Sequence, residues 1–389
     1  MDPNQQRDGQ NHRVALLACM QYAQVKGVIA HGINLLGGID ALCPGERYLL
    51  KPNLLLGDSP ERGSTTHPDF FNAAASLFTS GGYRLSYGDS PGFGSPQSAV
   101  HASGLSDIAS LLGLELADFI KGKDIPNPDG HLIKQFNLAQ GLLGLDGVIN
   151  LPKFKTHGLT RLTGAVKNLF GCLPGVQKAA FHARLQDEKR FGQMLVDLTE
   201  LIKPRLHIMD AVWGMEGNGP RNGTLRNIGV VLISTNPHAL DHCAALLMNL
   251  DPLLVPTLEA AQKRSLYHPE KIEVLGEPLE AHIMSDYLVN RSRISTTGAH
   301  GFYLDLFKQW VTPRPYILAE KCTHCGRCVR VCPSTPKALG FQNCCTTPPQ
   351  YNYGDCIRCY CCQEMCPHSA IERKTPFLGK VLLGTGEKR

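Results

Sequence analysis

Hydrophobic and polar positions along the first 310 residues alternate between two kinds of segment. Short apolar runs have the length and β-branched content of buried strands, and the longer segments between them have helical spacing. The predicted strands are 13–19, 47–56, 84–89, 147–154, 205–212, 229–235 and 271–276, and the predicted helices are 24–42, 68–80, 97–112, 184–203 and 239–264. This alternation predicts an α/β domain whose mostly parallel sheet is covered by helices.

Polar residues gather where several of the predicted strands end. "KPN" (51–53) interrupts the second strand, and "NLPKFKTHGLTRLTGAVKNLFG" (150–171) continues from the fourth. Ligands of such sheets bind beyond the carboxyl ends of the strands, and cations in a partly dry pocket need an anionic partner. We therefore predict a pocket for a small anion, and an ordinary solvated basic face is the alternative. The predicted substrate-binding residues are Lys51, Asn53, Lys153, Lys155, Lys167 and Asn168.

Three residues of the same stretch are candidate catalytic groups, namely His157, Lys155 and Lys167. An imidazole whose pKa is near about 6.5 can supply protons at neutral pH, so His157 is a candidate general acid. A hydrogen-bonded loop histidine without a catalytic role is the alternative. The glycine-containing segment 88–95 lacks the third glycine of a dinucleotide-binding fingerprint, which favours a plain strand-to-helix turn.

Eleven of the fifteen cysteines lie within residues 322–366. Two runs, "CTHCGRCVRVCP" (322–333) and "CIRCYCCQEMCP" (356–367), repeat one spacing. In such runs three thiolates on a tight loop bind one iron–sulfur cube, and the fourth cysteine ligates the other cube. The predicted ligand sets are Cys322, Cys325, Cys328 and Cys366 for one 4Fe-4S cluster, and Cys332, Cys356, Cys359 and Cys362 for the other. Structural zinc, whose cysteine pairs are usually further apart, is the alternative.

This segment resembles the bacterial-type two-cluster ferredoxin domain at all eight ligand positions. Three cysteines fall outside the pattern, and we interpret them as bystanders: Cys344, Cys345 and Cys361, the last being the one expected nearest to sulfide. Residues 333–355 are longer than a minimal ferredoxin hairpin, and their prolines predict a surface insertion. The predicted domains are 1–311 for the α/β part and 312–375 for the two-cluster part, followed by a tail at 376–389.

Residues 47–265 resemble the family called domain of unknown function 362, whose members often carry a ferredoxin module. The resemblance rests on "LLKPNLL", "TTHPD", "YGDSPGFG", "INLPKFKTHGLTRLTGAVKNLFG", "MDAVWGMEGNGPRNG" and "STNPHALD". It implies a fold and a cofactor rather than a particular reaction. A more distant likeness to the N-terminal domain of lactate-racemase-like proteins implies chemistry on a small carboxylated metabolite. None of that group's cofactor-binding residues is matched to a position here.

Composition narrows the classes of function further. The formal net charge is +5, a basic excess too small to indicate a nucleic-acid partner by itself. No apolar run approaches the ~18 residues that cross a bilayer, and the N-terminus lacks the features of a signal peptide. The clustering of the cysteines indicates a reducing compartment, so we expect a cytoplasmic protein.

Three hypotheses remain from the sequence. The first is an iron–sulfur oxidoreductase that exchanges electrons with a soluble donor or acceptor protein and delivers them through two 4Fe-4S clusters to a small anionic substrate. The second is an electron-transfer or assembly partner that docks on another enzyme through its basic face. The third is a redox-neutral enzyme acting on a small carboxylate, whose clusters have a structural or sensing role.

Overall fold

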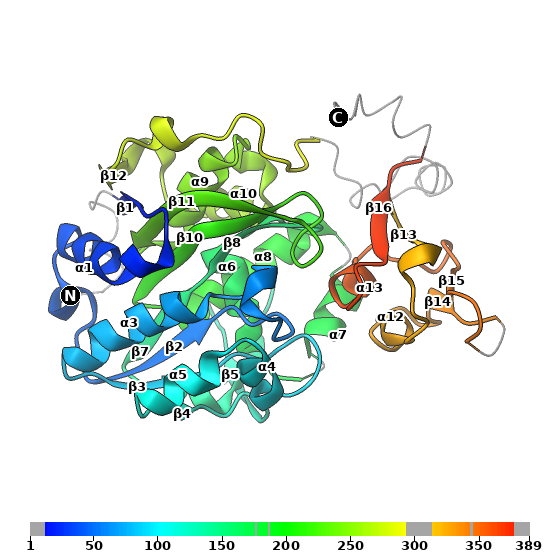
Figure 1. Cartoon of the computed structure of the whole chain (residues 1–389), viewed down its shortest axis with the longest axis horizontal. Coiled ribbons are helices and arrows are strands. Elements are labelled where there is room, and N and C mark those ends of the chain that lie inside the picture. The colour runs from blue at the N-terminus through cyan, green and yellow to red at the C-terminus, as the bar shows by residue number, and fades with distance from the viewer. Residues whose placement is uncertain (1–11, 176, 186, 293–312, 343–344, 377–389) are drawn as a thin grey trace.

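The computed structural model describes residues 12–175, 177–185, 187–292, 313–342 and 345–376 (Figure 1). Residues 12–292 form an α/β domain, and residues 313–376 form a smaller C-terminal module beside it. The predicted boundary at 311–312 lies outside the described residues, and so does the tail 376–389 apart from its first residue. Cys344 lies outside them as well.

A ten-stranded sheet forms the centre of the α/β domain. Its main path runs β12 (Ile272–Gly276), β1 (His12–Ala18), β11 (Thr224–Ser234), β10 (Leu206–Glu216), β7 (Gly147–Leu151), β2 (Arg47–Pro52), β3 (Arg84–Tyr87) and β4 (Glu115–Leu116). β11 is antiparallel to both of its neighbours, β1 and β10, whereas the other pairs along this path are parallel. The prediction of a mostly parallel sheet is therefore confirmed.

Helices cover both faces of this sheet (Figure 1). Successive strand side chains point to opposite faces, so Ile208 of β10 packs into one core and Met209 into the other. The first core is covered by α1 (Val25–Leu35), α3 (Pro68–Ser80), α4 (Pro96–Ala102) and α5 (Leu105–Leu111). The second is covered by α9 (Pro237–Leu247) and α10 (Pro256–Lys263). A third core lies between α8 (Glu188–Ile202) and the hairpin of β5 (Gly122–Pro126) and β6 (Gln135–Ala139).

Several predicted elements are divided in the structure. The predicted strand 147–154 is two strands, β7 and β8 (Lys153–His157), separated by Pro152, which has no N–H to donate to a neighbouring strand. The predicted helix 97–112 breaks at Gly104, whose φ of 73° lies in the left-handed region that favours glycine. The segments 24–42 and 239–264 each contain two helices as well, because α2 (Ile39–Leu42) is separate from α1 and α10 from α9.

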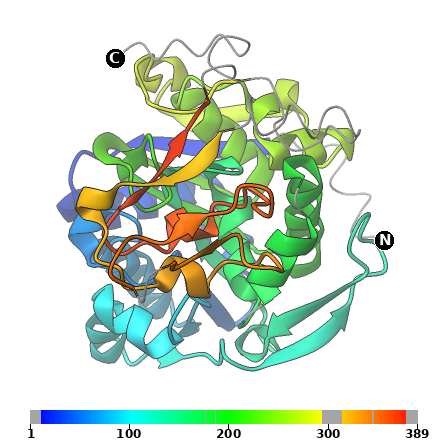
Figure 2. The same ribbon diagram turned by 90° about the vertical axis from the view of Figure 1, so that its right-hand side faces the viewer.

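The C-terminal module is built from two short antiparallel pairs. β13 (Arg314–Ile317) pairs with β16 (Ile371–Lys374), and β14 (Leu339–Gly340) pairs with β15 (Gln350–Tyr351). Each cysteine run contains one helical turn, α12 (Arg327–Arg330) in the first and α13 (Cys361–Glu364) in the second. Figure 2 shows the module in front of the middle of the α/β domain.

Side chains of the α/β domain fix the module in this position. Arg62 donates to Ser369 Oγ at 2.9 Å, and Asn222 donates to the carbonyl of Gln363 at 2.9 Å. Arg373 of the module donates in return to the carbonyl of Gly158 at 3.1 Å. Among the described helices, none is both long and apolar enough to pass through a bilayer.

Candidate functional site

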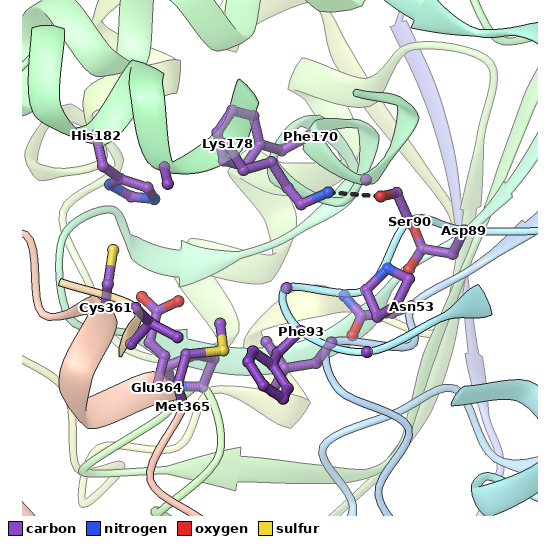
Figure 3. A pocket seen from close by; sticks show the side chains of 18 of the residues that line it. Asn53, Asp89, Ser90, Phe93, Phe170, Lys178, His182, Cys361, Glu364 and Met365 are labelled. Atoms are coloured by element: carbon purple, nitrogen blue, oxygen red, sulfur yellow. Dashed lines mark hydrogen bonds between the residues drawn. The ribbon is translucent and has the colours of Figure 1, made fainter. Parts of the chain in front are cut away.

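A cavity of ≈ 560 Å³ lies between the α/β domain and the C-terminal module (Figure 3). Asn53 follows β2 and Asp89 follows β3, so the strand-end loops of the α/β domain supply one wall. The module supplies the opposite wall, with Cys332, Cys361 and Glu364. The cavity therefore lies beyond the carboxyl ends of the parallel strands, where open α/β sheets bind their ligands.

Two of the predicted binding lysines lie outside the lining of this cavity and have carboxylate partners. Lys51 Nζ lies 2.8 Å from Asp89 Oδ1, and Lys153 Nζ lies 2.7 Å from Asp210 Oδ2. Both lysines are completely buried, and each needs such a partner because an unpaired buried ammonium is costly. Lys51 and Lys153 are thus paired within the protein.

Three other lysines line the cavity, and none of them has a carboxylate within salt-bridge distance among the described residues. They are Lys155, Lys167 and Lys178. Lys155 Nζ donates to Asn53 Oδ1 at 2.8 Å and to the carbonyl of Ser64. Lys178 Nζ donates to Ser90 Oγ at 2.7 Å and to the carbonyl of Leu173 at 2.8 Å (Figure 3). This part of the cavity therefore holds three amines whose protonated forms a bound anion would balance.

Lys167 differs from the other two because its amine has no hydrogen-bond acceptor within the described residues. It lies 4.9 Å from the ring centre of Phe170 and 6.0 Å from that of Phe191. The face of an aromatic ring attracts a cation without occupying its N–H donors fully. Lys167 is consequently the amine that is freest to bind a ligand.

A chain of buried amides orients Lys155. Asn53 Nδ2 donates to Asn168 Oδ1 at 2.9 Å, and Asn168 Nδ2 donates to Asn150 Oδ1 at 2.7 Å. Because the amide nitrogen of Asn53 is engaged in this way, its oxygen faces the Lys155 amine. Asn53 and Asn168 also line the cavity, so they position Lys155 and can themselves contact a bound ligand.

The helical turn α6 (Ala165–Asn168) carries both Lys167 and Asn168. Asp241 of α9 accepts from the backbone N–H of Ala165 at 2.6 Å and of Val166 at 3.1 Å. The first N–H groups of a helix have no partner within that helix, so the side chain of Asp241 satisfies two such groups of α6. This contact holds the turn, and hence Lys167, in place.

His157, the last residue of β8, contacts the module through its side chain. Its Nδ1 accepts from the N–H of Leu159 at 3.0 Å and of Thr160 at 3.2 Å, so the proton of the neutral ring is on Nε2. Nε2 lies 3.0 Å from Glu364 Oε1, although the N–H does not point in line at that oxygen. His157 therefore presents a proton to the cavity beside a carboxylate of the module.

Burial changes the acid–base properties of this group of residues. It lowers the pKa of Lys155 to about 7, that of Lys178 to about 8 and that of His182 to about 3. It also lowers the pKa of Lys167 and of His157, and in both cases Glu364 opposes this effect. A bound anion would raise the pKa of each of these groups, because an opposite charge nearby favours the protonated form.

Sequence reasoning misses two residues of the cavity, Lys178 and His182, which lie on α7 (Gln177–Arg184). The two side chains are four residues apart and so share one face of that helix. This spacing is the signal by which they could be found. No sequence pattern indicates that Glu364 lines the cavity, because its position there depends on how the module docks on the α/β domain.

The four predicted ligands of the first cluster come together in the structure. Cys322, Cys325, Cys328 and Cys366 line one small cavity, and we call this set the outer cysteine set because Cys325 is exposed. Burial raises the pKa of the Cys328 thiol to about 12. The neighbouring thiols that raise it further are Cys366, Cys325 and Cys322. Four thiols around one space, one of them from the second run, fit the crossed arrangement of a cubane cluster.

The other predicted set, Cys332, Cys356, Cys359 and Cys362, is called the inner cysteine set, because Cys332 lines the large cavity. Burial raises the pKa of Cys362, and the thiols of Cys359 and Cys356 raise it as well. Tyr351 donates its hydroxyl to Cys362 Sγ at 3.3 Å. In the part of the chain that the structure describes, no three His, Cys, Asp or Glu side chains converge on a single metal ion. A cubane cluster does not need such convergence, because each thiolate binds a different corner.

The bystander cysteines differ in their surroundings. Cys345 is exposed, within the predicted surface insertion. Cys361 is buried and lines the large cavity next to Glu364 (Figure 3). Cys361 is therefore the bystander closest to a bound ligand.

Comparisons with family models match both parts of the chain. A model described as "Domain of unknown function (DUF362)" matches residues 49–246, half of the chain. A model described as "4Fe-4S binding domain" matches residues 313–334, which contain the first cysteine run. The chain thus has a 4Fe-4S binding domain, and the lysines of the cavity lie within the first match.

Individual proteins also resemble the chain. The thylakoid-associated protein sll1697 of Synechocystis sp. is 38% identical over 250 residues, which are 63% of this chain and 77% of that protein. The lactate racemase apoprotein of Thermoanaerobacterium thermosaccharolyticum is 11% identical with a TM-score of 0.39, covering 63% of this chain and 59% of that one. A protein of Thermotoga maritima is also 11% identical, with a TM-score of 0.31 and coverage of 51% and 52%. The chain thus spans less than two thirds of each of these solved structures.

Proposed function

The chain belongs to the DUF362 family, and on that premise we propose that it is an iron–sulfur oxidoreductase that reduces an organic anion bound in the large cavity. The observation that carries this proposal is the lining of the cavity. Amines of the buried Lys155 and the half-buried Lys167 and Lys178 form one wall, and Cys332, a predicted cluster ligand, forms part of the other. An anion attracted by the amines would be bound beside the inner cysteine set.

We assign the two domains accordingly. Residues 1–311 bind the substrate, and residues 312–375 bind two 4Fe-4S clusters through the outer and inner cysteine sets. Each bound cluster supplies one electron, so two electrons and two protons convert a substrate S to SH₂, with a soluble one-electron donor protein as the reductant. The exposed Cys325 of the outer set is on a side that such a donor can approach. The proposed cellular location is the cytoplasm.

The chain's own residues would prepare the substrate for this reduction. Lys167 binds the anionic group, since its amine is the least engaged of the three. Lys155 adds charge from a position fixed by Asn53. Protonated Lys155, whose pKa burial lowers to about 7, supplies a proton to the reduced substrate, and the neutral ring of His157 donates a hydrogen bond to it from Nε2. Glu364, whose Oε1 lies 3.0 Å from that Nε2, orients the ring.

Replacing Lys167 by methionine tests this function. Reduced protein is mixed anaerobically with a panel of two-electron-accepting organic anions, such as 2-oxo acids and 2-enoic acids, and reoxidation is followed by visible absorbance. We expect one or more members to reoxidise the wild-type protein. Their rates should fall by about 10- to 100-fold in Lys167→Met, because a hydrogen bond to a charged group contributes roughly 1.5–3 kcal/mol.

Lys263 provides the matched control, because its side chain is 66% exposed on α10 and does not line the cavity. Lys263→Met should reoxidise at the wild-type rate. If Lys167→Met also keeps the wild-type rate with every active anion, the substrate does not bind at these lysines and the proposal is wrong.

A further inference from the structure

The size of the cavity sets a lower limit on its ligand. At ≈ 560 Å³ it falls within the range of about 300–1,000 Å³ that is usual for sites binding drug-sized molecules. A water molecule occupies about 30 Å³ of liquid, so an acid of two or three carbon atoms would leave most of this space to solvent. The volume indicates a ligand with a substantial body in addition to its charged group.

Several polar side chains of the cavity are buried and mark one end of it, whereas Lys167 and Lys178 are half-buried. Lys155 has no exposed surface, and the exposed fractions of His157, Asn168, His182 and Glu364 are 3%, 4%, 5% and 6%. At this end two polar atoms have neither a hydrogen bond nor an ion-pair partner within the described residues, His182 Nδ1 and Thr163 Oγ1. Figure 3 shows the ring of His182 facing the space above Cys361 and Glu364. Buried polar atoms without partners are rare in folded proteins, so these two indicate where a polar ligand group would bind.

Large apolar side chains line the exposed end of the cavity, together with Arg330, whose guanidinium lies 5.9 Å from the ring centre of Phe93. Phe93 and Ile120 line it and are exposed by 38% and 60%, and both belong to the group of large hydrophobic side chains on the surface. Leu55, Pro91 and Met365 continue this apolar wall. Met365 comes so close to Gly92 that a Cβ on that glycine would lie 2.3 Å from its Cε. The apolar wall is thus formed jointly by the α/β domain and the module.

The buried polar end and the exposed apolar side chains of the cavity together suit a ligand that has both a charged and an apolar part. We propose that the cavity binds an amphipathic organic anion, with a carboxylate or phosphate head at the amines of Lys155, Lys167 and Lys178 and an aliphatic or aromatic body extending to Phe93 and Ile120. The inference deepens the proposed function, on which its anionic head rests. A small hydrophilic anion would satisfy the buried end but would leave the apolar mouth in water, whereas a neutral apolar molecule would leave the amines without a counter-charge.

A series of straight-chain carboxylates from acetate to decanoate tests the inference. Their dissociation constants for the cluster-containing protein are measured by calorimetry under anaerobic conditions, below the concentrations at which they form micelles. We expect Kd to fall roughly fourfold per added methylene group, as burial of CH₂ groups predicts, and to level off once the tail passes the mouth. Octylammonium, with the opposite charge, should bind far more weakly than octanoate.

Variants separate the two ends of the cavity. Phe93→Ser and Ile120→Ser alter exposed side chains, so folding should be unaffected, and they should reduce the gain per methylene. Lys167→Met should raise Kd for the whole series by a similar factor and leave the gain per methylene unchanged. Octyl phosphate distinguishes the head groups: tighter binding than octanoate assigns phosphate, weaker binding assigns carboxylate, and both support an amphipathic anion.

Two results would overturn the inference, namely a Kd that does not depend on chain length and binding of octylammonium as tight as that of octanoate. The calorimetric measurement of Kd involves no electron transfer, so its result does not depend on whether the protein reduces the ligand. If only short anions bind but still reoxidise the reduced protein, the oxidoreductase proposal survives and the amphipathic ligand does not. If long anions bind without being reduced, the reverse holds.

Discussion

We expect Cys366→Ala to remove the cluster bound by the first cysteine run, although Cys366 lies in the second run. The reason is geometric, because Cys366 lines the same small cavity as Cys322, Cys325 and Cys328. A cluster with three thiolates is far less stable, since the loop supplies no other soft ligand in place of the fourth. Iron and acid-labile sulfide should each fall by about half.

Comparison with Cys328→Ala identifies which of the two clusters is lost in Cys366→Ala. Cys366→Ala and Cys328→Ala should leave the same remaining cluster, with the same electron paramagnetic resonance (EPR) spectrum after reduction. Cys332→Ala and Cys362→Ala should leave the other cluster and share a different spectrum. If Cys366→Ala instead matches Cys362→Ala, each run binds its own cluster and the crossed assignment is incorrect.

The second large effect is expected at the ion pair between Asp58 and Arg221. Arg221 Nε donates to both oxygens of Asp58, at 3.0 and 2.9 Å, and Arg221 Nη1 donates to the carbonyl of Cys366 at 2.6 Å. The two side chains are exposed by only 7% and 6%. Asp58→Ala leaves the guanidinium buried without its counter-charge, so we expect it to lower the free energy of unfolding by about 3–5 kcal/mol.

Urea unfolding under anaerobic conditions measures this loss. The double variant Asp58→Ala/Arg221→Met removes both charges and should recover part of the stability. Asp286→Ala is the exposed comparison, because Asp286 pairs with Arg226 while its side chain is 76% exposed, and it should cost at most about 1 kcal/mol. Equal losses for Asp58→Ala and Asp286→Ala would show that the buried ion pair contributes no more to the free energy of unfolding than the exposed one.

The fold could be predicted from the sequence wherever one local pattern decided it. The helix 68–80 is α3 with the predicted bounds, because Pro68 begins it and Gly81 follows its last residue. The division of the strand 147–154 was missed, since Phe154 follows closely after Pro152 and only that proline marks the break. The hairpin of β5 and β6 was also missed, because its strands lack a continuous apolar run.

The candidate site was predictable in location but not in detail. The lysines of the stretch 150–171 look alike in sequence, yet Lys153 pairs with Asp210 whereas Lys155 and Lys167 line the cavity. That distinction depends on Asp210, which is 57 residues away from Lys153. The wall supplied by Glu364 and Met365 depends on how the module docks, which no local pattern reports. The catalytic and binding roles of these residues remain predictions.

The most direct test of the central claim is the EPR spectrum of each cluster with and without octanoate. Cys366→Ala protein should retain only the cluster of the inner cysteine set, and Cys332→Ala protein only that of the outer set. Because Cys332 lines the cavity and the outer set does not, octanoate should change the spectrum of reduced Cys366→Ala and leave that of reduced Cys332→Ala unchanged. An unchanged spectrum in Cys366→Ala, with octanoate bound, would contradict the claim that the anion binds beside the inner cluster.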